Sequence, residues 1–209
     1  MPNWCSNSFY FYSKKKNKAD VLEFYLDMKN ALSDRDREDK DWVGRLFIGA
    51  GFTQKELDGL PLRGYVTNLS LIGQLEGVEI ESETAWVPND DAMQKLIDTK
   101  YPNLSMVFMA EECGCEIYIN SDTEGIRYKT RYMIDWTVDG DDWETKYYEK
   151  EEDMIKDLSA ILKLPNETVW SYYHGVKSKI DDRFEEIYSE DASLCLNEYT
   201  TESYRGGKK

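Results

Sequence analysis

The sequence is poor in the residues and motifs on which most catalytic sites depend. It has a single histidine, His174, and a catalytic or metal site built on histidine normally needs a second base or ligand beside it. It also lacks both Gly-x-x-x-x-Gly-Lys and Gly-x-Gly-x-x-Gly, so no phosphate-binding loop is expected. Asp139, Asp141, Asp142 and Glu144 could supply oxygen ligands to a cation, but Asp and Gly are expected in a turn at this position anyway. We therefore predict no catalytic residue, no metal site and no cofactor.

Long apolar runs are also missing. No stretch of about 18 apolar residues is present, so no membrane-spanning helix is expected. The first residues lack the basic and apolar regions of a signal peptide, which favours a cytoplasmic location. In that setting the four cysteines, Cys5, Cys113, Cys115 and Cys195, are expected to be free thiols.

Positive charge is scarce relative to negative charge. The chain has 26 Lys and Arg against 41 Asp and Glu, a net charge of −15. Such a surface repels nucleic acid and anionic membranes and favours a basic partner, although acidity can also serve solubility alone. The candidate partner-binding acids fall in two clusters, which are Asp34, Asp36, Glu38 and Asp39, and Asp181, Asp182, Glu185 and Glu186.

Apolar periodicity predicts an α+β fold. Alternation predicts a first strand over residues 7–13, and a helical stripe follows over 18–32. Two further strands over 64–72 and 77–85, a helix from about residue 88 and a strand over 104–110 complete a βαββαβ order. This is the order of a ferredoxin-like antiparallel sheet.

The rest of the chain is expected to extend that sheet and then become helical. Strands are predicted over 115–120, 126–134 and 143–148, as an antiparallel meander. One helix is predicted around residues 154–162 and a longer one over 169–187. The expected organisation is a domain over 1–148 with an insertion near 33–63, a helical extension over 149–199 packed on it, and a frayed tail over 200–209.

Two stretches resemble a known family. The opening Met1-Pro2-Asn3-Trp4-Cys5-Ser6-Asn7 and the block Thr84-Ala85-Trp86-Val87-Pro88 are similar to the YubB-type ferredoxin-like proteins of phages, plasmids and integrated elements. The sequence departs from that family at Val87 and at Cys113-Gly114. The resemblance implies a ferredoxin-like topology without an iron–sulfur cluster, and a bacterial host. The leading hypothesis is a non-enzymatic protein that binds a basic, nucleic-acid-handling host protein such as a defence nuclease.

The residues of those two blocks are expected to have structural roles. Asparagine ties down irregular backbone, tryptophan fills volume, and cysteine behaves as a small buried hydrophobe. We therefore interpret Asn3, Trp4, Cys5, Asn7 and Trp86 as a structural plug. Trp4 is predicted to be buried, and its replacement by alanine to destabilise the fold by roughly 3–5 kcal/mol.

An alternative hypothesis is single-stranded nucleic-acid binding by the sheet. On the strand predicted from Ile126, the basic residues Arg127, Lys129 and Arg131 would share one face. Bases could stack on Tyr10 and Tyr12 of the first strand. The opposing interpretation is a solvated strand face with acidic cross-strand partners.

Overall fold

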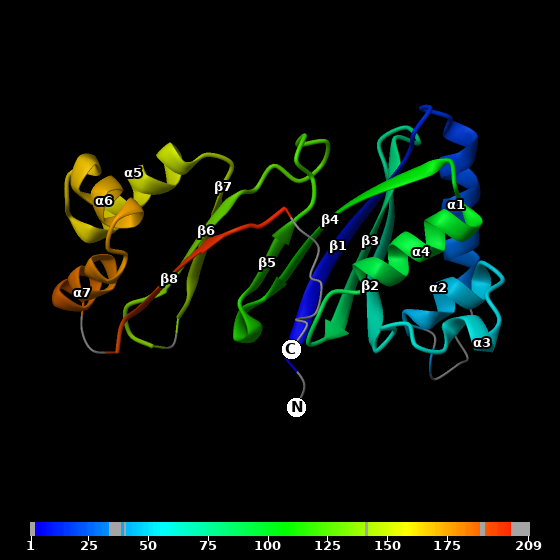
Figure 1. Ribbon diagram of the computed structural model, residues 1–209, viewed down its shortest axis with the longest axis horizontal. Helices are drawn as coiled ribbons and strands as arrows, with labels where there is room; N and C mark the ends of the chain where they lie inside the picture. Colours follow the sequence, from blue (N-terminus) through cyan, green and yellow to red (C-terminus); the bar gives the residue numbers. More distant parts are fainter. Residues whose placement is uncertain (1–2, 34–38, 40, 141, 189–190, 202–209) are drawn as a thin grey trace. The chain divides into compact units, whose positions relative to one another are not determined.

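The chain forms two compact units, seen in the computed structural model of Figure 1. The structure describes residues 3–33, 39, 41–140, 142–188 and 191–201. The second unit is Lys129–Thr200, so the chain divides after Tyr128 and not after residue 148 as the sequence suggested. The reason is that residues 129–148 contribute strands to a second sheet with its own core. The expected frayed tail falls almost wholly on 202–209, which lie outside the described residues.

The first unit is built on a five-stranded antiparallel sheet with the order β2-β3-β1-β4-β5. Its elements are β1 (Trp4–Ser13), α1 (Lys18–Ala31), α2 (Gly44–Gly49), α3 (Gln54–Leu57), β2 (Gly64–Ile72), β3 (Gly77–Ala85), α4 (Asp90–Lys100), β4 (Leu104–Glu112), the 3-10 turn η1 (Cys113–Cys115) and β5 (Ile117–Asn120). The predicted α+β class is confirmed, and β1-α1-β2-β3-α4-β4 follows the expected element order. The name ferredoxin-like stays a prediction.

The alternation of β1 separates the two faces of this sheet. Phe9 and Phe11 are fully buried in a core that includes Phe24 of α1 and Leu96 of α4. Both helices lie on this face of the sheet in Figure 1. Because side chains alternate along a strand and directly paired residues share a face, the opposite face is fixed by the register. We call it the outer face, and it carries Trp4, Ser6, Ser8, Tyr10, Tyr12, Glu79, Glu81, Glu83 and Ala85.

Local signals set the helix ends. The side chain of Asn17 accepts a hydrogen bond from the Ala19 N–H and caps α1, which has Asp20 in its first turn and Lys29 in its last. Helix α4 likewise begins with Asp90 and Asp91. The charges of Asp20 and Lys29 stabilise the dipole of α1 at its two ends.

The edge strand β2 is partly covered by the segment before α2. Trp42 forms an isolated antiparallel bridge with Tyr65, the Val66 N–H donates to the Asp41 carbonyl, and the Val43 N–H donates to the Gly64 carbonyl. The β2–β3 register shifts between Val66 and Asn68. The outer edge of β2 is therefore paired over its first residues, and a single break in the β2–β3 register follows them.

The second unit combines a three-stranded antiparallel sheet with three helices. Its elements are β6 (Tyr132–Thr137), β7 (Glu144–Tyr148), α5 (Glu151–Leu162), α6 (Asn166–His174), α7 (Ser178–Ile187) and β8 (Ser193–Glu198), with the strand order β7-β6-β8. Ile134, Leu158, Val169 and Phe184 belong to its core. Among the helices of the described residues, none combines the length and apolar character needed to cross a bilayer.

Three predictions about this part of the chain are wrong. Of the three strands expected to extend the first sheet, only β5 does so, because β6 and β7 pair with β8 instead. The strand predicted over 126–134 begins only at Tyr132. The long helix expected over 169–187 is two helices, since α6 ends at His174, with Gly175 as its C-cap, and α7 begins at Ser178.

Candidate functional site

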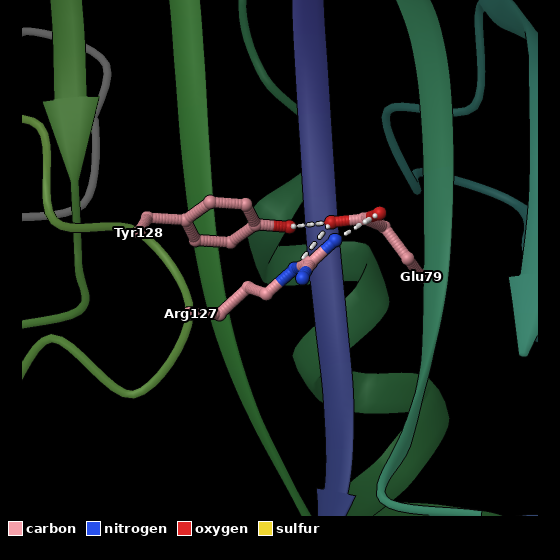
Figure 2. Close-up of polar contacts among 3 residues, drawn as sticks. All are labelled: Glu79, Arg127 and Tyr128. Carbon is pink, nitrogen blue, oxygen red and sulfur yellow. Dashed lines mark hydrogen bonds and ion pairs between the residues drawn. The ribbon is translucent and has the colours of Figure 1, made fainter. Parts of the chain in front are cut away.

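A buried carboxylate on the outer face organises the centre of the first sheet. Glu79 of β3 accepts two hydrogen bonds from the Arg127 guanidinium, from Nε at 3.0 Å and from Nη2 at 2.9 Å, and a third from the Tyr128 hydroxyl at 3.1 Å. Figure 2 shows both side chains extending toward Glu79 across β1. The bonds to Glu79 raise the pKa of Arg127, and burial followed by the Glu79 charge raises the pKa of Tyr128. The cluster therefore keeps Arg127 charged and Tyr128 protonated.

A second buried carboxylate places Arg127 where it can reach Glu79. Asp122 is 1% exposed, and its oxygens accept from the backbone N–H groups of Ile126, Arg127 and Tyr128 at 2.9, 2.6 and 2.8 Å. The Tyr128 carbonyl in turn accepts from Asn120 Nδ2 at 3.0 Å. These bonds fold the segment after β5 into a loop, which is why no strand runs through Ile126.

This loop removes the basis of the predicted nucleic-acid face. Arg127 is bound to Glu79 and lies 5.8 Å from the centre of the Tyr10 ring. Lys129 and Arg131 precede β6 and belong to the second unit, so the three basic residues do not form one strand face. The geometric premise of that hypothesis is therefore wrong.

The aromatic residues assigned to base stacking are also engaged. Tyr10 is only 6% exposed, and its ring lies over Gly77, where a Cβ atom would collide with it. Tyr12 stacks on Tyr10 with 5.8 Å between ring centres. Glu79, Glu81 and Glu83 occupy the same face, and their charge opposes phosphate binding.

Helix α7 presents the second predicted acidic cluster. Ile180 and Phe184 are buried in the core, while Asp181, Asp182, Glu185 and Glu186 are exposed on the other side of the helix. Burial, followed by the charges of Asp182 and Glu185, raises the pKa of Asp181. The cluster is thus self-repelling.

The basic residues of α7 are directed at the protein's own structure. Arg183 donates to the Leu162 carbonyl at 3.3 Å and pairs with Glu186 at 3.0 Å. Lys179 lies over the Tyr172 ring at 5.2 Å. Within the part of the chain that the structure describes, no ion pair is formed by Asp181, Asp182 or Glu185.

The first predicted acidic cluster is described only at one residue. Asp34, Asp36 and Glu38 lie outside the described residues, and Asp39 is exposed. The α7 cluster is therefore the one for which the geometry can be given.

The residues interpreted as a structural plug divide into two groups. Cys5 and Asn7 are buried as expected, and Asn7 Nδ2 donates to the Cys5 carbonyl, the Ser82 carbonyl and Thr84 Oγ1. Asn3 is exposed, and its carbonyl accepts from the Trp86 N–H. Trp4 and Trp86 are 43% and 46% exposed, so the prediction that they fill the core is wrong. Trp4 begins β1 and Trp86 directly follows β3, so both lie at the same end of the sheet, where neither is enclosed.

The groups considered for catalysis or metal binding have ordinary structural contacts. His174 Nε2 lies 2.8 Å from Glu151 Oε1, and its ring packs on Trp170. Asp139 accepts from Thr137 Oγ1 and from the Asp142 N–H, which stabilises the turn after β6. In the described ranges, no three His, Cys, Asp or Glu side chains are grouped so that they could hold a metal ion.

None of the four cysteines, all of which lie in the described residues, forms a disulfide. Cys5 is buried, and burial followed by the Glu112 charge raises the pKa of its thiol to about 12. Cys113 and Cys115 are exposed in η1, where the Glu112 carboxylate accepts from the N–H groups of Gly114 and Cys115. Its burial and the nearby Glu112 charge disfavour the thiolate of Cys5, so Cys5 is unsuited to act as a nucleophile.

The Asp122 turn and the Glu79–Arg127 pair could be predicted only in part from the sequence. The Asn120-Ser121-Asp122 run indicated a turn, but nothing local pointed to Glu79 as the partner of Arg127, 48 residues away.

Comparison of the chain with protein-family models, curated proteins and solved structures finds no match.

Proposed function

We propose that the protein is a non-enzymatic acidic protein that acts by binding a basic surface of another macromolecule. The observation that carries the proposal is the set of α7 carboxylates, Asp181, Asp182 and Glu185. They are exposed on one helix face, they repel one another, and the nearby cations of α7 are engaged elsewhere. A cationic partner would relieve this repulsion, which favours association.

The resemblance to YubB-type proteins of mobile elements suggests the class of partner. A host protein that handles nucleic acid, such as a defence nuclease, has a basic groove that an acidic surface can occupy. In this proposal the protein competes with nucleic acid for that groove and thereby inhibits the host protein.

The first experiment reverses the α7 charges. Wild-type protein and the variant Asp181→Lys, Asp182→Lys, Glu185→Lys are immobilised and exposed to bacterial lysate at about 50 mM salt, where charge-driven contacts are strongest. The wild type should retain basic proteins that are released by added double-stranded DNA, and the variant should not.

A matched control separates the α7 surface from net charge. Reversal of Glu23, Asp58 and Asp98, three exposed acids scattered over the first unit, changes the net charge by the same amount. This control should retain the same proteins as the wild type. The proposal would be contradicted if the α7 variant retained the same proteins as the wild type. It would also be contradicted if added salt released no basic protein from the wild type, the α7 variant or the control.

A low-salt gel shift tests the alternative directly. Retention of a single-stranded oligonucleotide at about 50 mM salt would favour nucleic-acid binding, because phosphate contacts are strongest there. We expect no retention by the wild type.

A further inference from the structure

Two exposed aromatic residues meet at the end of the outer face. Trp4 of β1 is 43% exposed and Tyr65 of β2 is 40% exposed, and their ring centres lie 5.3 Å apart at an interplanar angle of 64°. The register pairs Trp4 with Ala85 and Tyr65 with Glu83. Because Ala85 is small, the Trp4 ring can reach Tyr65 across β3.

Carboxylates lie in the next row of the same face. Glu83 and Glu111 are the register partners of Ser6 on its two sides, and Ser6 Oγ donates to Glu83 Oε1 at 2.8 Å. Adjacent strands are about 4.8 Å apart, so the Cα atoms of Glu83 and Glu111 are about 10 Å from each other. Glu83 is also the register partner of Tyr65, so a carboxylate stands directly beside the exposed aromatic pair. We call Trp4, Tyr65, Glu83 and Glu111 the aromatic-acidic surface.

The same sheet face already binds one arginine in this manner. Arg127 donates two hydrogen bonds to Glu79 and lies over the ring of Tyr10, and Tyr10 and Glu79 are register partners. Glu83 is the next-but-one acidic residue along β3 on that face, with Tyr65 as its aromatic register partner. The central cluster is thus an internal example of guanidinium recognition by a carboxylate and a neighbouring ring.

We propose that the aromatic-acidic surface binds an arginine side chain on an exposed segment of a partner protein. The guanidinium plane stacks on Trp4 or Tyr65, and its N–H groups pair with Glu83. Arginine suits the site better than lysine, because only a planar guanidinium can stack and donate two parallel hydrogen bonds at once. This inference rests on the proposed function, since it assigns a specific contact to the basic partner.

Charge favours an arginine side chain over two other possible occupants of this surface, a second copy of the chain and a nucleic-acid strand. A second copy of the chain would bring Glu83 and Glu111 against a like-charged surface, which opposes pairing through the aromatic rings. A nucleic-acid strand would place phosphates beside the same carboxylates. Both are outcomes that the following test can detect.

The test follows the tryptophan indole signals by nuclear magnetic resonance during titration with short capped peptides. The probes are an alternating arginine–glycine peptide, the matched lysine–glycine peptide and a glutamate–glycine peptide. The Trp4 signal is identified with Trp4→Phe. We expect the arginine peptide to shift the Trp4 signal, whereas the signal of Trp170, which is 53% exposed in the second unit, stays unchanged.

Variants then measure the contribution of each group. Trp4→Ala and Glu83→Gln should each weaken arginine-peptide binding about three- to tenfold, as expected for loss of a stacking or charge-assisted contact. Trp170→Ala should leave the affinity unchanged. Thermal melts monitor folding, and Trp4→Phe, which keeps a ring in place, should weaken binding less than Trp4→Ala.

The contrary outcomes are distinguishable. If the arginine peptide leaves the Trp4 signal unmoved, or if the lysine peptide or an oligonucleotide moves it more strongly, the inference is overturned. Concentration-dependent self-association that Trp4→Ala abolishes would also overturn it. Binding that is lost on reversal of the α7 acids but is insensitive to Trp4 and Glu83 would leave the proposed function intact and reject only this surface.

Discussion

Asp122 in the first unit and Asp181 in the second are acidic residues of the same type in opposite circumstances. Asp122 is buried and accepts three backbone hydrogen bonds, while Asp181 is exposed beside Asp182 and Glu185. Glu79 resembles Asp122, since Arg127 and Tyr128 satisfy it. The net charge of −15 thus combines carboxylates that hold the fold together with exposed carboxylates, which the proposed function assigns to recognition. Substitutions in the two groups should have different effects on stability and on binding.

The largest effect on stability is expected for Asp122→Ala. Three backbone N–H groups would lose a charged acceptor, which should lower the free energy of unfolding by about 3–5 kcal/mol. Hydrogen exchange at the amides of Ile126, Arg127 and Tyr128 should accelerate strongly. Asp122→Asn keeps one acceptor oxygen and should give an intermediate loss. Unchanged protection of these amides in Asp122→Ala would show that Asp122 does not order the loop.

The next largest effect on stability is expected for Asp90, a buried carboxylate next to Asp91. Burial, followed by the Asp91 charge, raises the pKa of Asp90 from 3.8 to about 6. The folded state then holds the proton more tightly than the unfolded state, so the free energy of unfolding should fall as pH rises from about 4 to about 6. Asp90→Asn should remove this fall and stabilise the protein at pH 7 by at most about 3 kcal/mol.

Urea denaturation of both proteins between pH 4 and pH 8 measures this difference. The two curves should agree near pH 4, diverge as the pH rises to about 6, and stay a constant distance apart above it. If the two free energies of unfolding differed by the same amount at every pH, the pKa of Asp90 would not differ between the folded and unfolded states.

A smaller loss is expected when the central ion pair of the outer face is broken. Arg127 is 36% exposed at its side chain, so water screens the pair, and Arg127→Ala should cost about 1–2 kcal/mol. Arg127→Lys keeps the charge but not the paired hydrogen bonds, and should recover only part of the loss. Denaturation monitored by tryptophan fluorescence would check both variants. Full recovery with lysine would show that charge alone matters at Glu79.

The smallest effect on stability is expected for substitutions of the α7 acids, which should give a gain and not a loss. Asp181→Asn with Asp182→Asn and Glu185→Gln removes like-charge repulsion and should stabilise the protein by about 0.5 kcal/mol at low salt. The gain should disappear at about 1 M salt, where the screening length is about 3 Å. Thermal melts at both salt concentrations test this. A loss of stability would place these residues with Asp122 as structural acids.

The sequence predicted the regular parts of the first sheet because their patterns are local. The alternation of Phe9 and Phe11 with Tyr10 and Tyr12 places β1 and its two faces correctly. The alternation of Ile126, Tyr128 and Thr130 was equally regular but misleading. There the Asp122 side chain takes the backbone N–H groups that a strand would have used.

Two other errors have physical reasons of a longer range. The apolar period of 169–187 continues through Gly175 because α6 and α7 pack their apolar residues into the same core, so the pattern concealed the break. Trp4 was assigned to the core from its residue type, but exposure at a strand end depends on which elements cover that end. The sequence singled out the acids that the structure shows exposed on α7, and their role in binding stays a prediction. The sequence did not reveal the aromatic-acidic surface, which the strand register assembles.

The covered edge of β2 limits how any partner can attach to the first sheet. An exposed edge strand invites another chain to add as an extra strand, and such addition also starts aggregation. Here the segment around Trp42 occupies hydrogen-bonding groups at the start of β2, just before the register shift between Val66 and Asn68. The opposite edge, β5, is only four residues long. Strand addition is therefore blocked at the start of β2. Attachment through side chains on the faces can be tuned by single substitutions without exposing a template for fibril growth.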